Sequence, residues 1–157
     1  MADRIRLGHV QLRVRDLACS RAFYERLLGW SLREAGRGVA FLGPGSEHHQ
    51  LALLEVGEDA PFVPFGVGLS HVAFEIDGPK AFVDLYRRLA QGGTTVSGVD
   101  LGVSWSLFLK DPDGNEVEIF CDTRNVKGGR RRWEGRGAAL GLAEALARVT
   151  DESAVGA

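Results

Sequence analysis

The sequence predicts an α+β fold built from two tandem βαβββ units, here called the first and second repeat. Two observations predict it. The pattern of one strand, one helix and three further strands occurs twice, in an internal repeat of roughly fifty residues. The opening strand of each repeat also carries a histidine, His9 in one and His71 in the other. One such sheet cannot cover its own apolar face, so we expect two to form a cleft or partial barrel.

The first repeat, about residues 5–56, opens with a strand at about 7–14 that contains His9. A helix is predicted at about 18–28, where four apolar residues recur at helical spacing and Gly29 ends the pattern. These four residues are Ala22, Phe23, Leu27 and Leu28. Three strands follow at about 31–35, 39–42 and 50–56.

A linker rich in Pro and Gly, 57–68, leads to the second repeat, about 69–122. Its first strand, about 69–76, contains His71, and a helix is predicted at about 79–91. Pro79 suits the first turn of that helix and Gly92-Gly93 end it. Strands follow at 94–98, 104–110 and 115–121, with Asp111–Asn115 as a hairpin turn between the last two.

Composition limits the class of protein. The 157 residues suit one domain at 1–122 with an extension at 123–157, and 45% hydrophobic content suffices for a core. A net charge of -2 argues against nucleic acid and anionic membranes as partners. Without a signal pattern or a membrane-length apolar run, we expect a cytoplasmic protein. Cys19 and Cys121 are then expected to be free thiols.

The extension at 123–157 begins with a basic, glycine-rich run at 127–133. A short amphipathic helix is predicted at 138–149, and the last eight residues are expected to be disordered. The expected apolar stripe of this helix is Leu140, Ala143, Leu146 and Ala147. We expect the extension to pack on a partner subunit or to cap the cleft.

Three residues give the chain its candidate chemistry. His9, His71 and Glu118 each lie in a short apolar strand pattern. His9 and His71 occupy equivalent positions of the two repeats, and Ala52 is the equivalent of Glu118. Two imidazoles and one carboxylate bind a divalent metal and leave coordination positions open for substrate. The set suits Fe(II), which we favour, and also Mn, Zn or Ni.

Several segments are typical of one family. They are 9–17, 20–24 leading to Leu28-Gly29, and Asp111–Asn115 leading to Glu118. With the paired repeats and the three ligands, the chain resembles the vicinal oxygen chelate superfamily over about residues 5–122. The resemblance implies a homodimeric metalloenzyme whose small-molecule substrate chelates the metal through two adjacent oxygens. Members include glyoxalase I, extradiol dioxygenases, fosfomycin-resistance transferases, epimerases and bleomycin-sequestering proteins.

The segment from His48 to Leu53 resembles the part of extradiol ring-cleavage dioxygenases that carries an active-site histidine. The resemblance makes His49 the acid–base residue and catechol-like compounds the substrates. His49 reaches the metal only if its strand begins after it or has a bulge. Further candidate substrate contacts are His48, Trp105 and Phe108. Phe108 stands where these enzymes have a tyrosine, and 99–101 lacks their further histidine.

Other members remain as alternatives. A glyoxalase needs a fourth ligand at the position of Ala52, whereas a fosfomycin-type transferase needs cations such as Arg13, Arg15 or Lys110. Epimerases need only the three ligands and a pocket. A drug-sequestering protein would instead line its cleft with aromatic residues. The candidates for such a lining are Trp30, Phe41, Phe65, Phe74, Trp105 and Phe108.

Overall fold

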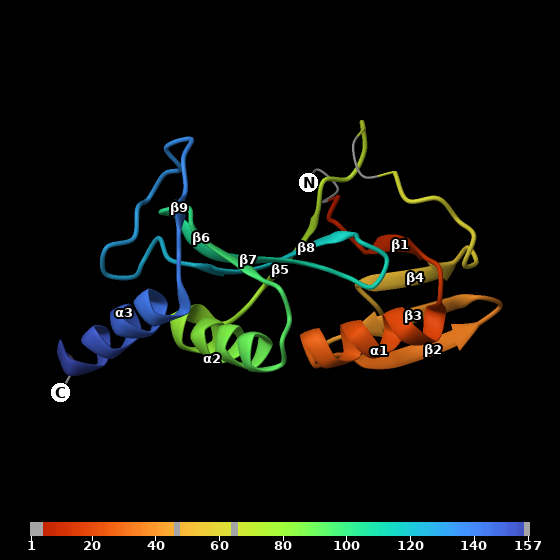
Figure 1. Ribbon diagram of the computed structural model, residues 1–157, viewed down its shortest axis with the longest axis horizontal. Coiled ribbons are helices and arrows are strands. Elements are labelled where there is room, and N and C mark those ends of the chain that lie inside the picture. The colour runs from red at the N-terminus through yellow and green to blue at the C-terminus, as the bar shows by residue number, and fades with distance from the viewer. Residues whose placement is uncertain (1–4, 46–47, 64–65, 156–157) are drawn as a thin grey trace. The chain divides into compact units, whose positions relative to one another are not determined.

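The computed structural model describes residues 5–45, 48–63 and 66–155 and confirms the α+β fold with two βαβββ repeats (Figure 1). The first repeat contains β1 (Val10–Val14), α1 (Leu17–Leu28), β2 (Ser31–Gly36), β3 (Val39–Gly43) and β4 (Leu51–Glu55). The second contains β5 (Val72–Glu75), α2 (Gly78–Gln91), β6 (Ser97–Asp100), β7 (Ser104–Lys110) and β8 (Glu116–Asp122). The extension adds β9 (Ala138–Ala139) and α3 (Leu142–Val155). Among the described residues, no helix is long and apolar enough to cross a bilayer.

Contacts divide the chain into two compact units. Unit 1 comprises the chain up to Gly68 together with Asp111–Asn115, the turn between β7 and β8. Unit 2 comprises Leu69–Lys110 and the chain from Glu116 onward. The predicted linker therefore groups with unit 1, and its residues 64–65, including the candidate Phe65, lie outside the described part.

Both sheets have the same topology. Their strand orders are β1-β4-β3-β2 and β5-β8-β7-β6-β9, and in each sheet the first strand pairs in parallel with the last strand of its repeat. Val10 lies opposite Leu51 in β4, and Val72 lies opposite Val117 in β8. Ala52 and Glu118 therefore occupy equivalent positions of the two sheets.

Helix α1 has polar residues on its inward face. The side chain of Asp16 accepts a hydrogen bond from the backbone N–H of Cys19 at the helix start, and Gly29 ends the helix with φ +67°. The buried positions are Ser20, Tyr24 and Leu27, spaced at one face. The predicted apolar stripe is therefore wrong in part, because Ala22 is exposed.

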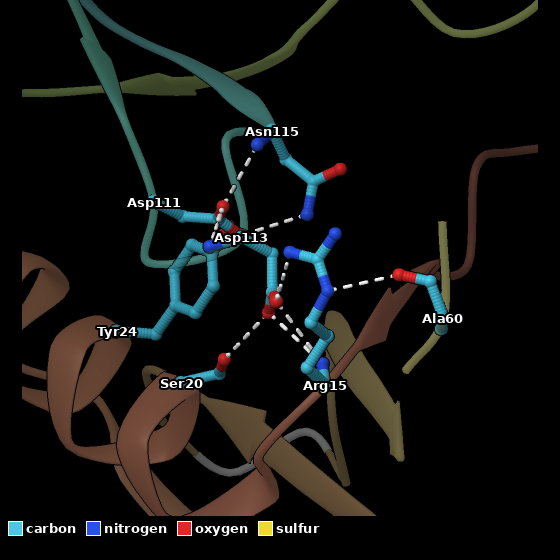
Figure 2. A network of polar contacts seen from close by, with 7 residues as sticks. All are labelled: Arg15, Ser20, Tyr24, Ala60, Asp111, Asp113 and Asn115. Carbon is cyan, nitrogen blue, oxygen red and sulfur yellow. Dashed lines mark hydrogen bonds and ion pairs between the residues drawn. The ribbon is translucent and has the colours of Figure 1, made fainter. Parts of the chain in front are cut away.

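The hairpin turn Asp111–Asn115 explains this polar face (Figure 2). Tyr24 donates its hydroxyl hydrogen to Oδ2 of Asp111 at 2.9 Å, and Ser20 donates to Oδ2 of Asp113 at 3.2 Å. The backbone N–H of Arg15 also donates to Asp113. Burial, reinforced by the negative charge of Asp111, raises the pKa of Tyr24. The turn thus satisfies buried donors of α1 that water cannot reach.

In unit 2 the odd-numbered residues of β7 and β8 face α2. Trp105 contacts Phe82 of α2 with ring centroids 5.9 Å apart. The strand residues buried on this face are Trp105, Leu107, Leu109, Val117, Ile119 and Cys121. Even-numbered residues, including Phe108 and Glu118, point to the opposite face because side chains alternate along a strand.

The extension packs on the rest of unit 2. Its expected contact with a partner subunit, or over the cleft, stays a prediction. β9 pairs with β6, and α3 lies beside α2 (Figure 1). The helix begins at Leu142, later than predicted, because Ala138–Ala139 form the edge strand. Within residues 142–150, Ala145 is buried, whereas Ala143, Leu146 and Ala147 of the predicted stripe are exposed. It continues to Val155, through most of the segment predicted to be disordered.

Polar side-chain contacts help to hold the extension on the rest of unit 2. Tyr86 of α2 donates its hydroxyl hydrogen to the carbonyl oxygen of Leu140 at 3.3 Å, and both residues are buried. Arg148 pairs with Asp100 at 2.6 Å and lies over the ring of Trp105 at 5.6 Å from its centroid. Asp100 belongs to the stretch 99–101, which lacks the further histidine of extradiol enzymes. In this chain the stretch supplies the carboxylate that pairs with Arg148.

Candidate metal and acid–base site

His71 and Glu118 form a close pair in unit 2. β5 and β8 are adjacent parallel strands with Ala73 opposite Glu118, and His71 directly precedes β5. Nε2 of His71 lies 3.1 Å from Oε2 of Glu118. Glu118 is only 8% exposed, on a strand whose other residues are mostly apolar. A carboxylate in such surroundings needs a cationic or hydrogen-bonding partner, so this pair is a candidate for metal binding.

Phe108 lies beside this pair. It is the partner of Glu118 across the β7–β8 ladder, and its ring meets the ring of His71 edge-on at 5.9 Å. The structure therefore brings together three of the residues singled out from the sequence. Because phenylalanine has no hydroxyl, it gives this side of the pair an apolar wall and no proton donor.

His9, His48 and His49 form a second group, in unit 1. The rings of His9 and His49 have centroids 4.7 Å apart, and Phe41 packs on His49 at 4.6 Å. Nδ1 of His48 lies 2.6 Å from Nδ1 of His49. Glu34, which the sequence did not indicate, lies with Oε2 3.2 Å from Nε2 of His48.

His49 meets the geometric condition set by the sequence. Strand β4 begins at Leu51, two residues after His49, so the strict alternation of the strand does not apply to its side chain. Gln50 fixes the approach, because its N–H donates to Leu42 and its carbonyl accepts from Val10. His49 is thereby placed against His9, the residue that directly precedes β1.

The surroundings of His49 favour its neutral form. Shielding from solvent, followed by the nearby imidazoles of His9 and His48, lowers the pKa of His49 below the ordinary histidine value. Its Nε2 is shielded from solvent and has no hydrogen-bond partner among the described residues. A neutral imidazole with an unused nitrogen is suited to accepting a proton.

Trp105 lies apart from the His71–Glu118 pair. It is opposite Cys121 in the ladder and points to the face that α2 covers, away from Phe108 and Glu118. On that side it lines a cavity of about 280 Å³ together with residues of the extension, Arg148 among them. The position of Trp105 thus gives it a packing role in unit 2.

The cations considered for an anionic substrate are used otherwise or exposed. Nε of Arg15 donates to the carbonyl of Ala60 at 2.9 Å, and its guanidinium pairs with Asp113 at 3.4 Å. Arg13 is exposed on β1, and Ala52 is fully buried where a fourth carboxylate ligand was sought. Among the described residues, Ala52 thus offers no ligand and Arg15 is engaged by Asp113 and Ala60.

The predicted ligands are divided between the two units: His9 belongs to unit 1, and His71 with Glu118 to unit 2. Within residues 5–45, 48–63 and 66–155, no three His, Cys, Asp or Glu side chains are gathered as a metal-binding group. The donor chemistry suits a divalent cation, since His9 offers an imidazole in unit 1 and His71 offers one beside the buried carboxylate of Glu118 in unit 2.

Comparison with known proteins identifies the family. A sequence model of the Glyoxalase/Bleomycin resistance protein/Dioxygenase superfamily matches residues 6–119. The chain belongs to this superfamily. Enzymes of the superfamily bind divalent metals. The predicted resemblance to this group is therefore confirmed.

Relatives within the superfamily include two kinds of enzyme. Biphenyl-2,3-diol 1,2-dioxygenase 3 of Rhodococcus globerulus is 34% identical over 120 residues, covering 74% of this chain and 63% of that enzyme. Catechol-2,3-dioxygenase of Bacillus subtilis is 30% identical, with 41% of its length covered. The chain thus spans less than two thirds of these dioxygenases. Lactoylglutathione lyase of Salmonella typhimurium is 30% identical over 125 residues, with 92% of its length covered.

Solved structures agree on the fold. A glyoxalase/dioxygenase from Nostoc punctiforme superposes with a TM-score of 0.63 at 25% identity, covering 74% of this chain and 90% of that one. A superfamily member from Nocardioides has a TM-score of 0.59 at 23% identity and covers 90% of this chain and 93% of its own. The second similarity extends beyond the residues that the family pattern matches.

Proposed function

We propose that the protein is a metal-dependent dioxygenase of the extradiol type, acting on a catechol-like substrate. His9, His71 and Glu118 are the proposed ligands of a divalent metal, with Fe(II) favoured. Two groupings carry the proposal. His9 contacts His49 within unit 1, and His71 pairs with Glu118 within unit 2. Two relatives named as dioxygenases of vicinal diols support the same reaction class.

The proposed ligands suit the task chemically. His9 and His71 offer imidazole nitrogens, and Glu118 offers a carboxylate that is only 8% exposed. A bound divalent metal would supply open positions for two adjacent substrate oxygens and for dioxygen. Phe108 gives the His71–Glu118 pair an apolar neighbour against which an aromatic ring can lie.

His49 is the proposed acid–base residue. Its Nε2 takes a proton from a hydroxyl group of the substrate and returns it as the ring opens. Three properties support this role: the ring lies beside His9, Nε2 is shielded from solvent, and the pKa of the imidazole is lowered. A base that is neutral at physiological pH is ready to accept a proton when substrate arrives.

A lyase of the lactoylglutathione type is the second candidate. One observation favours it: the chain spans 92% of the length of such a lyase, compared with 63% and 41% of the two dioxygenases. Ala52 weighs against it, because a glyoxalase would have a fourth ligand at this position and a buried alanine offers none. Metal content and oxygen uptake together separate the two candidates.

The test begins with metal content by elemental mass spectrometry on protein purified without oxygen. We expect about one iron per chain and at least a tenfold loss in His71→Ala and Glu118→Gln, as expected when first ligands are removed. The control is Glu58→Gln, an exposed carboxylate. Oxygen uptake with catechol and biphenyl-2,3-diol should then match the amount of ring opened.

Three results would overturn the proposal. Full metal content in His71→Ala would refute the ligand set. Stoichiometric zinc, nickel or manganese with lactoylglutathione formation and no oxygen uptake would establish the lyase. A chain that takes up no metal on titration would refute both enzymes.

A further inference from the structure

A line of three side chains in unit 1 leads from the surface to His49. Oε2 of Glu34 lies 3.2 Å from Nε2 of His48, and Nδ1 of His48 lies 2.6 Å from Nδ1 of His49. The Glu34 and His48 side chains are 68% and 59% exposed. The inner end is different, because Nε2 of His49 is shielded from solvent and has no hydrogen-bond partner among the described residues.

The backbone places Glu34 at the outer end of this line. The pairing of β2 with β3 shifts its register between Leu32 and Glu34. Such a bulge redirects the side chains that follow it. Arg33, inside the bulge, donates to the carbonyls of Gly43 and Gly45, at the start of the loop that leads to His48.

The histidine segment is also closely packed. A Cβ at Gly43 would lie 3.3 Å from the Cα of His49 and 3.5 Å from the carbonyl oxygen of His48. The ring of Phe41 contacts both imidazoles, with ring centroids 5.6 Å apart for His48 and 4.6 Å apart for His49. Both rings therefore contact Phe41 on β3, and the backbone that carries them packs closely on Gly43.

The chemistry of the groups fixes where the protons lie. An ionised carboxylate only accepts hydrogen bonds, so Nε2 of His48 carries the hydrogen that Glu34 accepts. When His48 is neutral, its Nδ1 then has a lone pair and must accept from Nδ1–H of His49. Since neutral His49 carries one hydrogen, its Nε2 is left with a free lone pair.

We propose that Glu34 and His48 are positioning residues that hold His49 in the tautomer with hydrogen on Nδ1 and a free lone pair on Nε2. The catalytic role of this tautomer rests on the proposed function, because Nε2 of His49 is the atom proposed to take the substrate proton. The tautomer itself depends only on residues of unit 1. It is therefore measurable without metal, substrate or turnover.

The decisive variant is Glu34→Lys. A lysine ammonium only donates, so Nε2 of His48 must become the acceptor and Nδ1 of His48 the donor. Nδ1 of His49 then has to accept, and the hydrogen of His49 moves to Nε2. Glu58→Lys makes the same charge change at another exposed position and is the matched control.

The experiment is ¹⁵N NMR of histidine-labelled full-length protein, prepared without metal, at pH 8, where an imidazole of ordinary pKa is neutral. We expect His49 to show hydrogen on Nδ1 in the wild type and in Glu58→Lys. Glu34→Lys should change the ratio of the two tautomers at least tenfold toward Nε2–H. Wild-type hydrogen on Nε2, or an unchanged ratio in Glu34→Lys, would overturn the proposal.

Turnover separates this inference from the proposed function. If the protein opens catechols, Glu34→Lys should lower kcat with little change in KM, and Glu58→Lys should leave both unchanged. A confirmed tautomer without catechol turnover would refute the dioxygenase and leave the positioning role intact. Catechol turnover with an unchanged kcat in Glu34→Lys would refute only the catalytic role of the positioning residues Glu34 and His48.

Discussion

Replacing Tyr24 by phenylalanine removes one hydroxyl group from unit 1 and keeps every carbon of the ring. Tyr24 is fully buried, and its hydroxyl donates to the Asp111 carboxylate at 2.9 Å. Tyr86→Phe is the matched control, because Tyr86 is also buried but donates to a neutral carbonyl at 3.3 Å. The two variants delete the same atom from a charged and from an uncharged hydrogen bond.

The structure sets the size of each effect. A hydrogen bond to a charged group contributes about 1.5–3 kcal/mol to the free energy of unfolding, and a neutral one about 0.5–1.5 kcal/mol. Asp111 keeps other donors, the N–H groups of Asp113 and Asn115, so its carboxylate is not left unpaired in Tyr24→Phe. We therefore expect Tyr24→Phe to cost about 2 kcal/mol, roughly 1 kcal/mol more than Tyr86→Phe.

The assay is urea unfolding at pH 7, followed by circular dichroism and by tryptophan fluorescence. Coincident transitions and an unchanged slope with urea justify comparing free energies. A Tyr24→Phe cost below about 0.5 kcal/mol would refute the reasoning, because a buried charged hydrogen bond then contributes no more than a solvated one. A cost equal to that of Tyr86→Phe would refute the special contribution of the Asp111 charge.

The same variant has a defined pH dependence. The folded state raises the pKa of Tyr24 above its unfolded value near 10, chiefly through burial. The stabilising contribution is therefore complete below pH 10 and is lost progressively as the pH rises above it. The stability difference between wild type and Tyr24→Phe should shrink above pH 10, and a difference that grows there would contradict this sign.

Two further predictions concern the cysteines and the glycine at position 98. A thiol reagent at pH 8 should modify exposed Cys19 alone in the folded protein, because Cys121 is buried and burial raises its pKa to about 11; immediate reaction of both thiols would refute this. Gly98→Ala should cost about 1–3 kcal/mol and speed trypsin cleavage of the extension, since a Cβ there would lie 2.2 Å from the Leu140 carbonyl oxygen. Gly141→Ala, which has open space, is the control, and equal cleavage of the two variants would contradict the steric argument.

The sequence predicted the repeats because they depend on local signals. Gly29 ended a helix where its positive φ was needed, and the alternating strands placed Glu118 on the face opposite the helix-covered core. The equivalence of His9 and His71 followed from the same patterns. Each of these features is determined by residues within a few positions of one another.

What the sequence did not predict depends on distant partners. Ser20 and Tyr24 face inward because their acceptors, Asp113 and Asp111, lie 93 and 87 residues later in the chain. The role of Glu34 depends on a register shift in β2 that leaves no sign in the residue pattern. The inward face of α3 differed from the predicted stripe because contact with α2, rather than hydrophobic spacing, selected it.

The two buried tyrosines, Tyr24 and Tyr86, both find their hydrogen-bond acceptors outside their own repeat. Tyr24 and Tyr86 are separated by the same number of residues as His9 and His71, so they are counterparts in the two repeats. The hydroxyl of Tyr24 finds its acceptor in the hairpin turn of the later repeat, and that of Tyr86 finds one in the extension. Neither repeat supplies its own acceptor. A single repeat of this kind would therefore leave its buried tyrosine hydroxyl without an acceptor, and the acceptor has to come from another part of the chain.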